Sequence, residues 1–301
     1  MKIIIKENPF PYKVEKLLLK YFIIPGNYGK IDKKNMTKIM YILEKYKKEY
    51  KYIISKAIIY SMRNKYMVDR ETKNHFKLKK YKKEVIKDFL KSKSYNSIIN
   101  ISKKYDISPI KILKEIMKFQ NIPKENINII LYYVDTEKYS KLKKLYPFIN
   151  NKAIYAIKDI LLADTVNPIN QAKVKEHADG FENKLKYLID NKLNIKYKTE
   201  EELAEEQTKK FGRAIATPDF LIHSELIING VNINWIDAKN YYGADANFVI
   251  NNIKKQGKKY IKLFGPGAIV FNLGYSSKLS QSINDKNILL LSFMDLEKIK
   301  K

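Results

Sequence analysis

The stretch TPDFLIHSELIINGVNINWIDAK, residues 217–239, contains two apolar runs that are separated by Asn229-Gly230. Both turn residues tolerate a positive φ, so Asn-Gly between two such runs predicts a β-hairpin. The runs cover residues 220–228 and 231–238, and pairing 228 with 231 would place Asp219 opposite a position near 240. We therefore expect Asp219 and the end of the second run to meet at one edge of a sheet.

Asp237, Ala238 and Lys239 form an acid-x-Lys pattern at the end of the second run. Side chains at i and i+2 of a strand point to the same face, so this acid and this lysine can reach one phosphate together. Phosphodiester hydrolysis uses a divalent cation, and hard cations such as Mg²⁺ prefer carboxylate oxygens. In the alternative interpretation, Asp219 caps a turn and Lys239 is a solvated surface residue. The pattern occurs six times, starting at Asp32, Glu49, Glu71, Glu182, Asp190 and Asp237, and only the last closes an apolar strand.

Around the hairpin, the C-terminal half alternates between helical and strand patterns. A helix over 182–188 precedes a short strand near 193–197, and Thr199 with Glu202 reads as the capping box of another short helix. A helix over 245–263 and apolar runs over 268–273 and 288–293 complete the chain. We predict an α/β domain at 166–301, with a central mixed sheet flanked by helices.

The N-terminal half, residues 1–165, is predicted to be an all-helical domain, which makes the whole chain a two-domain α+β protein. Residues 94–118, SYNSIINISKKYDISPIKILKEIMK, resemble a helix-turn-helix. Ser108 can cap its second helix, and Pro109 suits the first turn because no amide hydrogen is needed there. Nucleic-acid-binding candidates on an exposed face of that helix are Lys111, Lys114 and Lys118. The alternative is an ordinary helical hairpin with solvated lysines.

The charge of the chain is concentrated in this half. Residues 1–150 contain 36 Lys and Arg against 14 Asp and Glu, a net charge of +22, whereas residues 151–301 contain 23 against 18, a net of +5. This asymmetry favours a polyanionic partner, DNA, for the basic half. Biased codon usage would also enrich Lys, Ile, Asn and Tyr, but it does not explain why one half has most of the excess.

The composition excludes several classes of protein. The chain has no cysteine, which excludes disulfides, thiolate zinc sites and cysteine nucleophiles. The histidines His75, His177 and His223 have no partner at ligand spacing. No apolar run reaches the ~18 residues of a membrane span, and the N-terminus is too short in its apolar part for a signal peptide. We expect a soluble intracellular protein without a membrane partner, located in the cytoplasm or nucleoid of a prokaryote or the nucleus of a eukaryote.

Three stretches carry a resemblance to a known family: RAIATPDFLI (213–222), INGVNINWIDAK (228–239) and KKQGKKYIKLFGPGAIVFNLGY (254–275). They resemble the TPD sequence-motif family (codanin-interacting nuclease-like), in the PD-(D/E)xK nuclease superfamily, and the resemblance extends from about residue 180 to 293. It implies DNA hydrolysis that depends on Mg²⁺ (or Mn²⁺), with Asp219 and Asp237 as metal ligands and Lys239 positioning or activating the water. The chain departs from the eukaryotic members in having Asp237 where they have Glu.

The same resemblance adds three candidate residues, and the chemistry of arginine adds a fourth. Glu182 matches a third metal-binding carboxylate, although an acid near a helix start is also favoured by the helix dipole. Gln256 and Tyr260, one helical turn apart, match a Gln-x-x-x-Tyr of related nucleases, with a surface amide and a core aromatic as the alternatives. Arg213 could contact a phosphate or simply be a loop arginine.

The function predicted from the sequence is a Mg²⁺-dependent DNA endonuclease, with structured DNA among its candidate substrates. The alternative is a catalytically inert DNA-binding or scaffold protein with a nuclease-like fold. The sequence leaves open whether the chain forms a homodimer and whether it has a protein partner.

Overall fold

The computed structural model of the 301-residue chain describes residues 1–50, 54–167 and 179–299. The chain forms two compact units, and neither is a single continuous segment. The first combines Met1–Leu19, Met40–Tyr66 and Val174–Lys301, and the second combines Lys20–Ile39 and Met67–Lys173. The domain boundary expected between residues 165 and 166 thus lies close to residue 174, where the last segment of the first unit begins. Two N-terminal segments, however, belong to the unit that contains the sheet.

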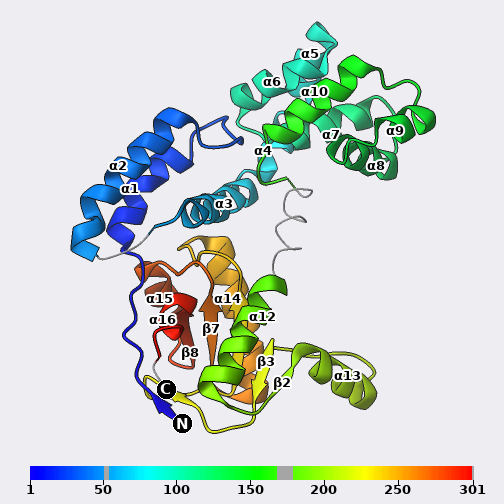
Figure 1. Cartoon of the computed structure of the whole chain (residues 1–301). Coiled ribbons are helices and arrows are strands. Elements are labelled where there is room, and N and C mark those ends of the chain that lie inside the picture. The colour runs from blue at the N-terminus through cyan, green and yellow to red at the C-terminus, as the bar shows by residue number, and fades with distance from the viewer. Residues whose placement is uncertain (51–53, 168–178, 300–301) are drawn as a thin grey trace. The chain divides into compact units, whose positions relative to one another are not determined.

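A five-stranded mixed sheet forms the centre of the first unit (Figure 1). Its strand order is β2-β3-β6-β7-β8, with antiparallel pairing from β2 to β6 and parallel pairing from β6 to β8. The two strands at the parallel end are apolar and almost wholly buried, as expected for strands covered on both faces. The strands are β2 (Tyr197–Thr199), β3 (Phe220–Ile222), β6 (Trp235–Lys239), β7 (Gly267–Phe271) and β8 (Ile288–Ser292).

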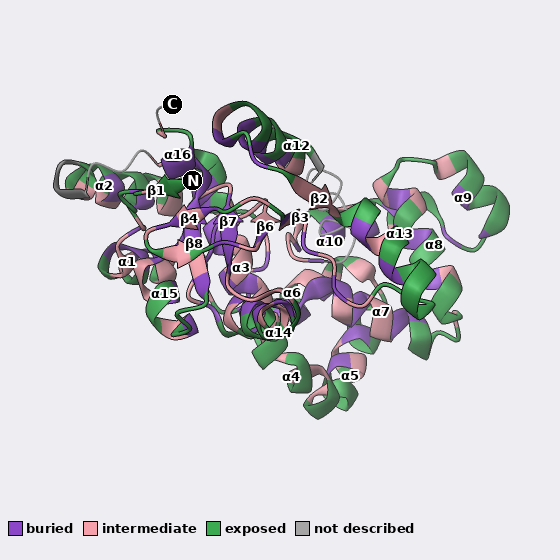
Figure 2. Ribbon diagram, turned by 90° about the horizontal axis from the view of Figure 1, so that it is seen from below, coloured by how far each residue is buried: buried purple, intermediate pink, exposed green. Residues whose placement is uncertain are grey.

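Helices cover both faces of this sheet. Helix α12 and helix α14 lie on opposite sides of the strands (Figures 1 and 2). The core on the α12 side contains Phe181 and Leu185 together with Ile236 of β6, so alternate residues of β6 face the α14 side. The helices are α12 (Asp179–Leu188), α13 (Glu200–Phe211), α14 (Asn247–Phe264), α15 (Ser277–Ile283) and α16 (Phe293–Leu296), with a π-helical turn at Ile189–Leu193.

Two local predictions for this half are confirmed. Thr199 and Glu202 form a reciprocal capping box, which satisfies two amide hydrogens at the start of α13. Asn229 and Gly230 both have positive φ, and Ile228 pairs with Val231 as expected. The hairpin strands β4 (Ile227–Ile228) and β5 (Val231–Asn232) nevertheless belong to a separate small sheet, in which β1 (Lys2–Ile3) pairs in parallel with β4.

The hairpin does not continue into β3 and β6 in one register. Leu226 accepts a hydrogen bond from Ile233, whereas Ile222 donates to Asn234, so three residues on the first arm have no opposite partner. The amide of His223, the first of the three, turns instead to the carbonyl of Lys196 beside β2. This insertion places Phe220 opposite Ile236, and the prediction that Asp219 pairs near residue 240 is therefore wrong.

The first unit also contains the beginnings of α1 and α3. The carboxylate of Glu15 is wholly buried and accepts hydrogen bonds from the hydroxyls of Tyr66 (2.6 Å) and Tyr242 (3.2 Å). The amide of Phe10 donates to the carbonyl of Tyr275, which joins the chain before α1 to the chain before α15. The helices concerned are α1 (Tyr12–Phe22), α2 (Lys33–Tyr50) and α3 (Lys56–Lys73).

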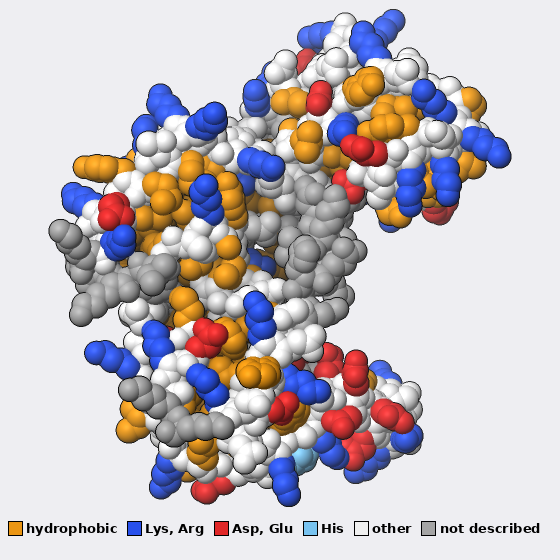
Figure 3. All heavy atoms as spheres, viewed as in Figure 1, with side chains coloured by type: hydrophobic (Ala, Val, Ile, Leu, Met, Phe, Trp, Pro, Cys, Tyr) orange, Lys and Arg blue, Asp and Glu red, His pale blue; other side chains and the backbone are white. Residues whose placement is uncertain are grey.

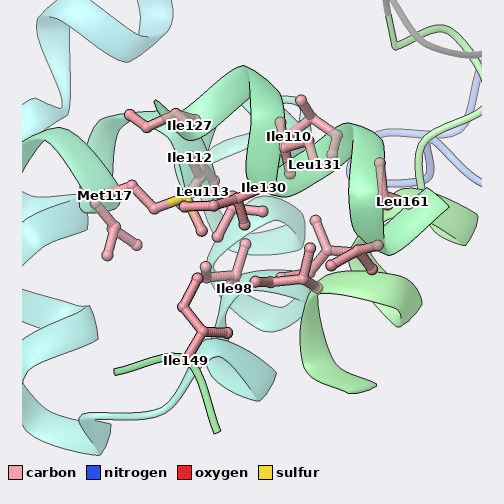
Figure 4. Close-up of a cluster of buried hydrophobic side chains, with 14 of the residues drawn as sticks. Ile98, Ile110, Ile112, Leu113, Met117, Ile127, Ile130, Leu131, Ile149 and Leu161 are labelled. Carbon is pink, nitrogen blue, oxygen red and sulfur yellow. The ribbon is translucent and has the colours of Figure 1, made fainter. Parts of the chain in front are cut away.

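The second unit is helical throughout, as predicted, and is built on a core of isoleucine, leucine and methionine side chains (Figure 4). Helix α7 lies in the middle of this core and packs against α5, α6, α8 and α10. The helices that follow α3 are α4 (His75–Lys80), α5 (Lys82–Ser92), the 3-10 turn η1 (Tyr95–Ser97), α6 (Ile98–Tyr105), α7 (Pro109–Phe119), α8 (Lys124–Asp135), α9 (Tyr139–Leu145) and α10 (Asn151–Leu162).

The predicted helix-turn-helix is present as a local structure. Asp106 has a left-handed backbone (φ 53°) at the turn, and the hydroxyl of Ser108 accepts the amide of Lys111 at the start of α7. Its second helix is not a free surface helix, because every residue of α7 before Lys118 is buried or half-buried. Within the described residues, no helix has the length and apolar character that a membrane crossing needs.

The three lysines predicted to line an exposed face of α7 all contact other side chains of the helical unit. Lys111 forms an ion pair with Glu71 (2.5 Å), and Lys114 donates to the side chain of Asn128 (3.0 Å). Lys118 is exposed and lies 3.8 Å from a carboxylate oxygen of Glu115. The prediction of a single exposed lysine face is wrong for the first two, because apolar residues surround α7 on most of its circumference.

Candidate active site

Strands β3 and β6 bring the two aspartates of the sequence motif together. Phe220 pairs with Ile236, which places Asp219, one residue before β3, at the level of Asp237. The Oδ2 atom of Asp219 accepts a hydrogen bond from the amide of Ala238 at 2.5 Å. The carboxylate of Asp219 therefore lies against the middle residue of the Asp-x-Lys pattern.

Asp237 and Lys239 point to the α14 side of the sheet, two residues apart on one strand, as their spacing predicted. The side chain of Asp237 is only 3% exposed and that of Lys239 is 18% exposed, and the two form an ion pair. The Oδ2 atom of Asp237 is buried and is the oxygen that the Lys239 ammonium contacts in this ion pair.

The electrostatics of the site reflect how closely these charges are packed. Burial and, after it, the neighbouring charge of Asp237 raise the pKa of Asp219 well above its ordinary value, although the amide of Ala238 and the charge of Lys239 act in the opposite direction. Burial lowers the pKa of Lys239, but the charges of Asp237, Tyr241 and Asp219 outweigh this effect and hold that pKa above its usual range. The site thus concentrates negative charge that a bound cation would stabilise.

Gln256 and Tyr260 connect this site to α14. The amide nitrogen of Gln256 donates to Oδ1 of Asp237 (2.8 Å) and to the hydroxyl of Tyr260 (3.0 Å). The hydroxyl of Tyr260 in turn donates to the carbonyl of Thr217 (3.0 Å), two residues before Asp219. The ring of Tyr260 packs edge-on against Trp235, so Tyr260 belongs both to the core and to this hydrogen-bond chain.

Glu182 lies on α12, the helix on the opposite side of the sheet. Its charge is near enough to contribute to the raised pKa of Asp219. However, no three acidic or histidine side chains among residues 1–50, 54–167 and 179–299 converge as a group that could hold a metal ion. The structure thus brings Glu182 into the neighbourhood of the two aspartates without completing a cluster of three carboxylates.

One charged residue beside the site comes from far away in the sequence. The ammonium of Lys65, on α3, lies 3.5 Å from the ring centroid of Tyr241, two residues after Lys239. Four residues earlier on α3, the hydroxyl of Ser61 accepts the amide of Tyr242 (2.9 Å), which fixes α3 to this loop. The sequence carries no motif at Lys65, and only its four-residue spacing from Ser61 indicates a shared helix face.

The remaining candidates fall outside this cluster. Arg213 is exposed at the start of the segment that leads to Asp219. Lys111, Lys114 and Lys118 belong to the second unit. Of the histidines, His75 forms a hydrogen bond between its Nδ1 atom and the carbonyl of Thr72, and His223 is exposed. His177 lies outside the described residues.

Comparisons with known proteins identify relatives but no characterised one. The model of a family described as proteins of unknown function with a TPD sequence motif matches residues 150–293. An uncharacterized protein, L539, of Acanthamoeba polyphaga mimivirus is 31% identical over 259 residues, which cover 83% of this chain and 80% of the viral protein. No solved structure is significantly similar to the chain. The matched region includes Asp219, Asp237 and Lys239.

Proposed function

The chain belongs to the TPD sequence-motif family, and we propose that it is a metal-dependent nuclease of the PD-(D/E)xK type that hydrolyses DNA. The observation that carries the proposal is the hydrogen bond from the amide of Ala238 to the carboxylate of Asp219. It sets one carboxylate beside a second, Asp237, and beside the ammonium of Lys239. Two carboxylates and one cation at the end of paired strands supply the parts that phosphodiester hydrolysis requires.

The donor atoms fit a small hard cation. Both proposed ligands, Asp219 and Asp237, are carboxylates, which Mg²⁺ and Mn²⁺ favour, and the pKa of Asp219 is raised by the neighbouring charge of Asp237, which a cation would offset. Mg²⁺ usually retains several water molecules and is held by only one or two carboxylates, so Glu182 need not be a direct ligand. When bound, the ion would polarise the phosphate and lower the pKa of a water molecule that attacks it.

The chain's own residues have distinct roles in this proposal. Asp219 and Asp237 hold the metal ion, and Lys239 faces the same point and interacts with the phosphate or the attacking water. Gln256 holds one oxygen of Asp237 and thereby directs the other. Tyr260 fixes Gln256 and the backbone before Asp219, which makes it a positioning residue.

The net charge of +22 in residues 1–150 supports DNA as the polyanionic partner. Lys111, Lys114, Lys118 and Arg213 remain candidates for phosphate contact, the first two only if their contacts within the unit rearrange. The competing proposal is an inert DNA-binding or scaffold protein, and the complete Asp-Asp-Lys set argues against it.

Cleavage assays on the full chain test the proposal. Single-stranded, duplex, flap and four-way-junction DNA would be incubated with Mg²⁺ or Mn²⁺ and with the variants Asp219→Asn, Asp237→Asn and Lys239→Met. We expect each variant to lose about a hundredfold or more of the cleavage rate, because each removes a charge that acts on the reacting phosphate.

Two controls make the assay decisive. Each variant should still bind DNA and should keep the fluorescence of Trp235, the single tryptophan, which lies in the core beside the site. Cleavage that persists in all three variants would refute this active site. DNA binding by the wild type without cleavage of any substrate would favour the inert alternative.

A further inference from the structure

A cleft with a volume of about 550 Å³ opens beside Lys239 in the first unit. One wall is the backbone segment Ala214–Thr217, which leads to Asp219, and the other is one side of α14. Tyr241 and Tyr260 provide aromatic surface in the same cleft. The cleft therefore begins at the candidate active site and extends away from it along a helix.

The charged residues that line this cleft are all lysines: Lys239, Lys255 and Lys259. Lys255 and Lys259 are exposed and stand four residues apart, about one turn or 6 Å along the helix axis. Within the part of the chain that the structure describes, no carboxylate forms an ion pair with either of them. Two exposed ammonium groups without counter-charges on one wall of the cleft form a site for an extended anion.

The wall opposite these lysines is held in place by a buried side chain. The amide nitrogen of Gln207, on α13, donates to the carbonyl of Ala216 (2.7 Å). Its amide oxygen accepts from the backbone of Ile215 (2.6 Å) and Ala216 (2.9 Å). Because three hydrogen bonds fix this segment, the cleft is preformed.

The acidic side chains of α13 do not enter the cleft. Figure 3 shows a group of acidic side chains over α13, with other acidic and many basic side chains scattered over the rest of the visible face. None of the residues lining the cleft is acidic. A phosphate backbone that runs along α14 therefore meets positive charge without opposing carboxylates.

We propose that this cleft binds the nucleic-acid strand that continues from the scissile phosphate, with Lys255 and Lys259 contacting successive parts of its backbone. The proposal rests on the proposed function for the position of the scissile bond. The expected ligand is a polyanionic strand of several nucleotides, rather than a free nucleotide, because Lys255 and Lys259 stand about one helical turn apart and line the same cleft as Lys239. Tyr241 and Ile215 supply the apolar surface against which sugars or bases pack.

The chain offers a matched control on the same helix. Lys254 and Lys258 are exposed like Lys255 and Lys259, have the same four-residue spacing, and do not line the cleft. The double variants Lys255→Ala/Lys259→Ala and Lys254→Ala/Lys258→Ala lose the same charge and gain the same helix propensity. They differ only in the direction in which the lysines point.

Binding would be measured by fluorescence anisotropy with the full chain and a labelled single strand of about six nucleotides, without divalent metal. We expect the cleft variant to bind about tenfold more weakly and to lose roughly 1.4 from the slope of log affinity against log salt, since two phosphate contacts disappear. The control variant should change by less than about twofold, because its lysines face away from the strand.

The outcomes separate this proposal from the proposed function, because binding is measured without cleavage. A selective loss of binding in the cleft variant, in a chain that never cleaves DNA, would support the cleft and refute the nuclease. Equal losses in both double variants, or no loss in either, would overturn the cleft assignment. Binding of a mononucleotide as tightly as the six-nucleotide strand would overturn the assignment of an extended strand.

Discussion

Lys65 is the charged residue that an N-terminal helix brings to the neighbourhood of the candidate active site. Burial and, to a smaller extent, the positive charge of Lys239 together lower the pKa of its ammonium to about 8. Contact of the ammonium with the ring of Tyr241 offsets part of the free-energy cost of burying this charge. A half-buried lysine close to a second lysine therefore lowers the stability of the folded chain at neutral pH.

The charge of Lys65 predicts how stability depends on pH. Between the folded pKa of about 8 and the ordinary lysine pKa of 10.5, the unfolded chain binds more protons, so the folded state gains stability as pH rises. Lys65→Met removes this dependence and also removes the cost of the buried charge at neutral pH. We expect the variant to be more stable than the wild type at pH 7 and to lose that advantage between pH 8 and 10.

Thermal unfolding followed by Trp235 fluorescence checks this expectation, because Trp235 reports on the first unit. Lys65→Arg serves as the comparison, since an arginine stays charged throughout this pH range. A constant difference between Lys65→Met and wild type from pH 7 to 10 would contradict the assigned pKa shift.

The positions of β6 and β7 depend on a glycine at the start of β7. A Cβ atom on Gly267 would lie 2.2 Å from the indole ring of Trp235, which is fully buried and donates its Nε1 hydrogen to the carbonyl of Gly265. The strand pairing therefore requires a residue without a side chain at this place. Asp237 lies on β6, so a shift of this strand pair would displace the candidate active site.

Gly267→Ala should therefore destabilise the first unit by about 1–3 kcal/mol or more, because the overpacked indole must shift within a rigid core. Gly180→Ala in α12 is the control, since open space surrounds that position and alanine favours a helix. Urea unfolding monitored by Trp235 fluorescence measures both variants. Equal stability of the two variants would show that the core around Trp235 can relax.

The insertion of three residues at 223–225 shows how an element can be predicted correctly while its register is not. Asn229-Gly230 predicts the turn because it depends on local φ preferences. The register beyond the turn depends on the hydrogen bond from the amide of His223 to the carbonyl of Lys196, a residue beside β2 that is far away in the sequence. The insertion shifts Asp219 from the level of residue 240 to the level of Asp237.

At the scale of the whole molecule, the unit that contains the sheet is completed by N-terminal segments. β1 pairs with β4, Phe10 bonds to Tyr275, and Glu15 accepts from Tyr66 and Tyr242. A fragment limited to residues 166–301 would lose all of these contacts. Residues 67–173, by contrast, contain the whole hydrophobic cluster around α7, although Lys20–Ile39 also belongs to the helical unit.

We therefore predict that the fragment 166–301 unfolds at a lower urea concentration than the full chain, with Trp235 fluorescence as the common readout. The fragment 67–173 should retain its helical circular dichroism and unfold cooperatively, because the hydrophobic cluster around α7 lies wholly within it. An identical urea midpoint for 166–301 and the full chain would refute the contribution of residues 1–19 and 40–66 to the sheet unit.

The sequence by itself determined the features that depend on neighbours along the chain. Two apolar runs on either side of Asn229-Gly230 predicted the strands around Asp237, and the helix over 245–263 was predicted with Gln256 and Tyr260 one turn apart. Thr199 with Glu202 predicted the start of α13. The helical second unit followed from apolar residues at three- and four-residue spacing. Hydrophobic periodicity and helix capping depend on residues that are close together in the sequence, so they can be predicted without knowledge of the tertiary contacts.

Only the tertiary structure decided which distant groups meet. It placed the carboxylate of Asp219 on the amide of Ala238, buried α7 in the middle of the second unit, and kept Glu182 on the helix across the sheet. It also brought Lys65 to Tyr241 and completed the sheet unit with the N-terminal segments. The physical reason is that burial, register and like-charge contacts arise between elements, and their energies depend on packing that no local pattern contains.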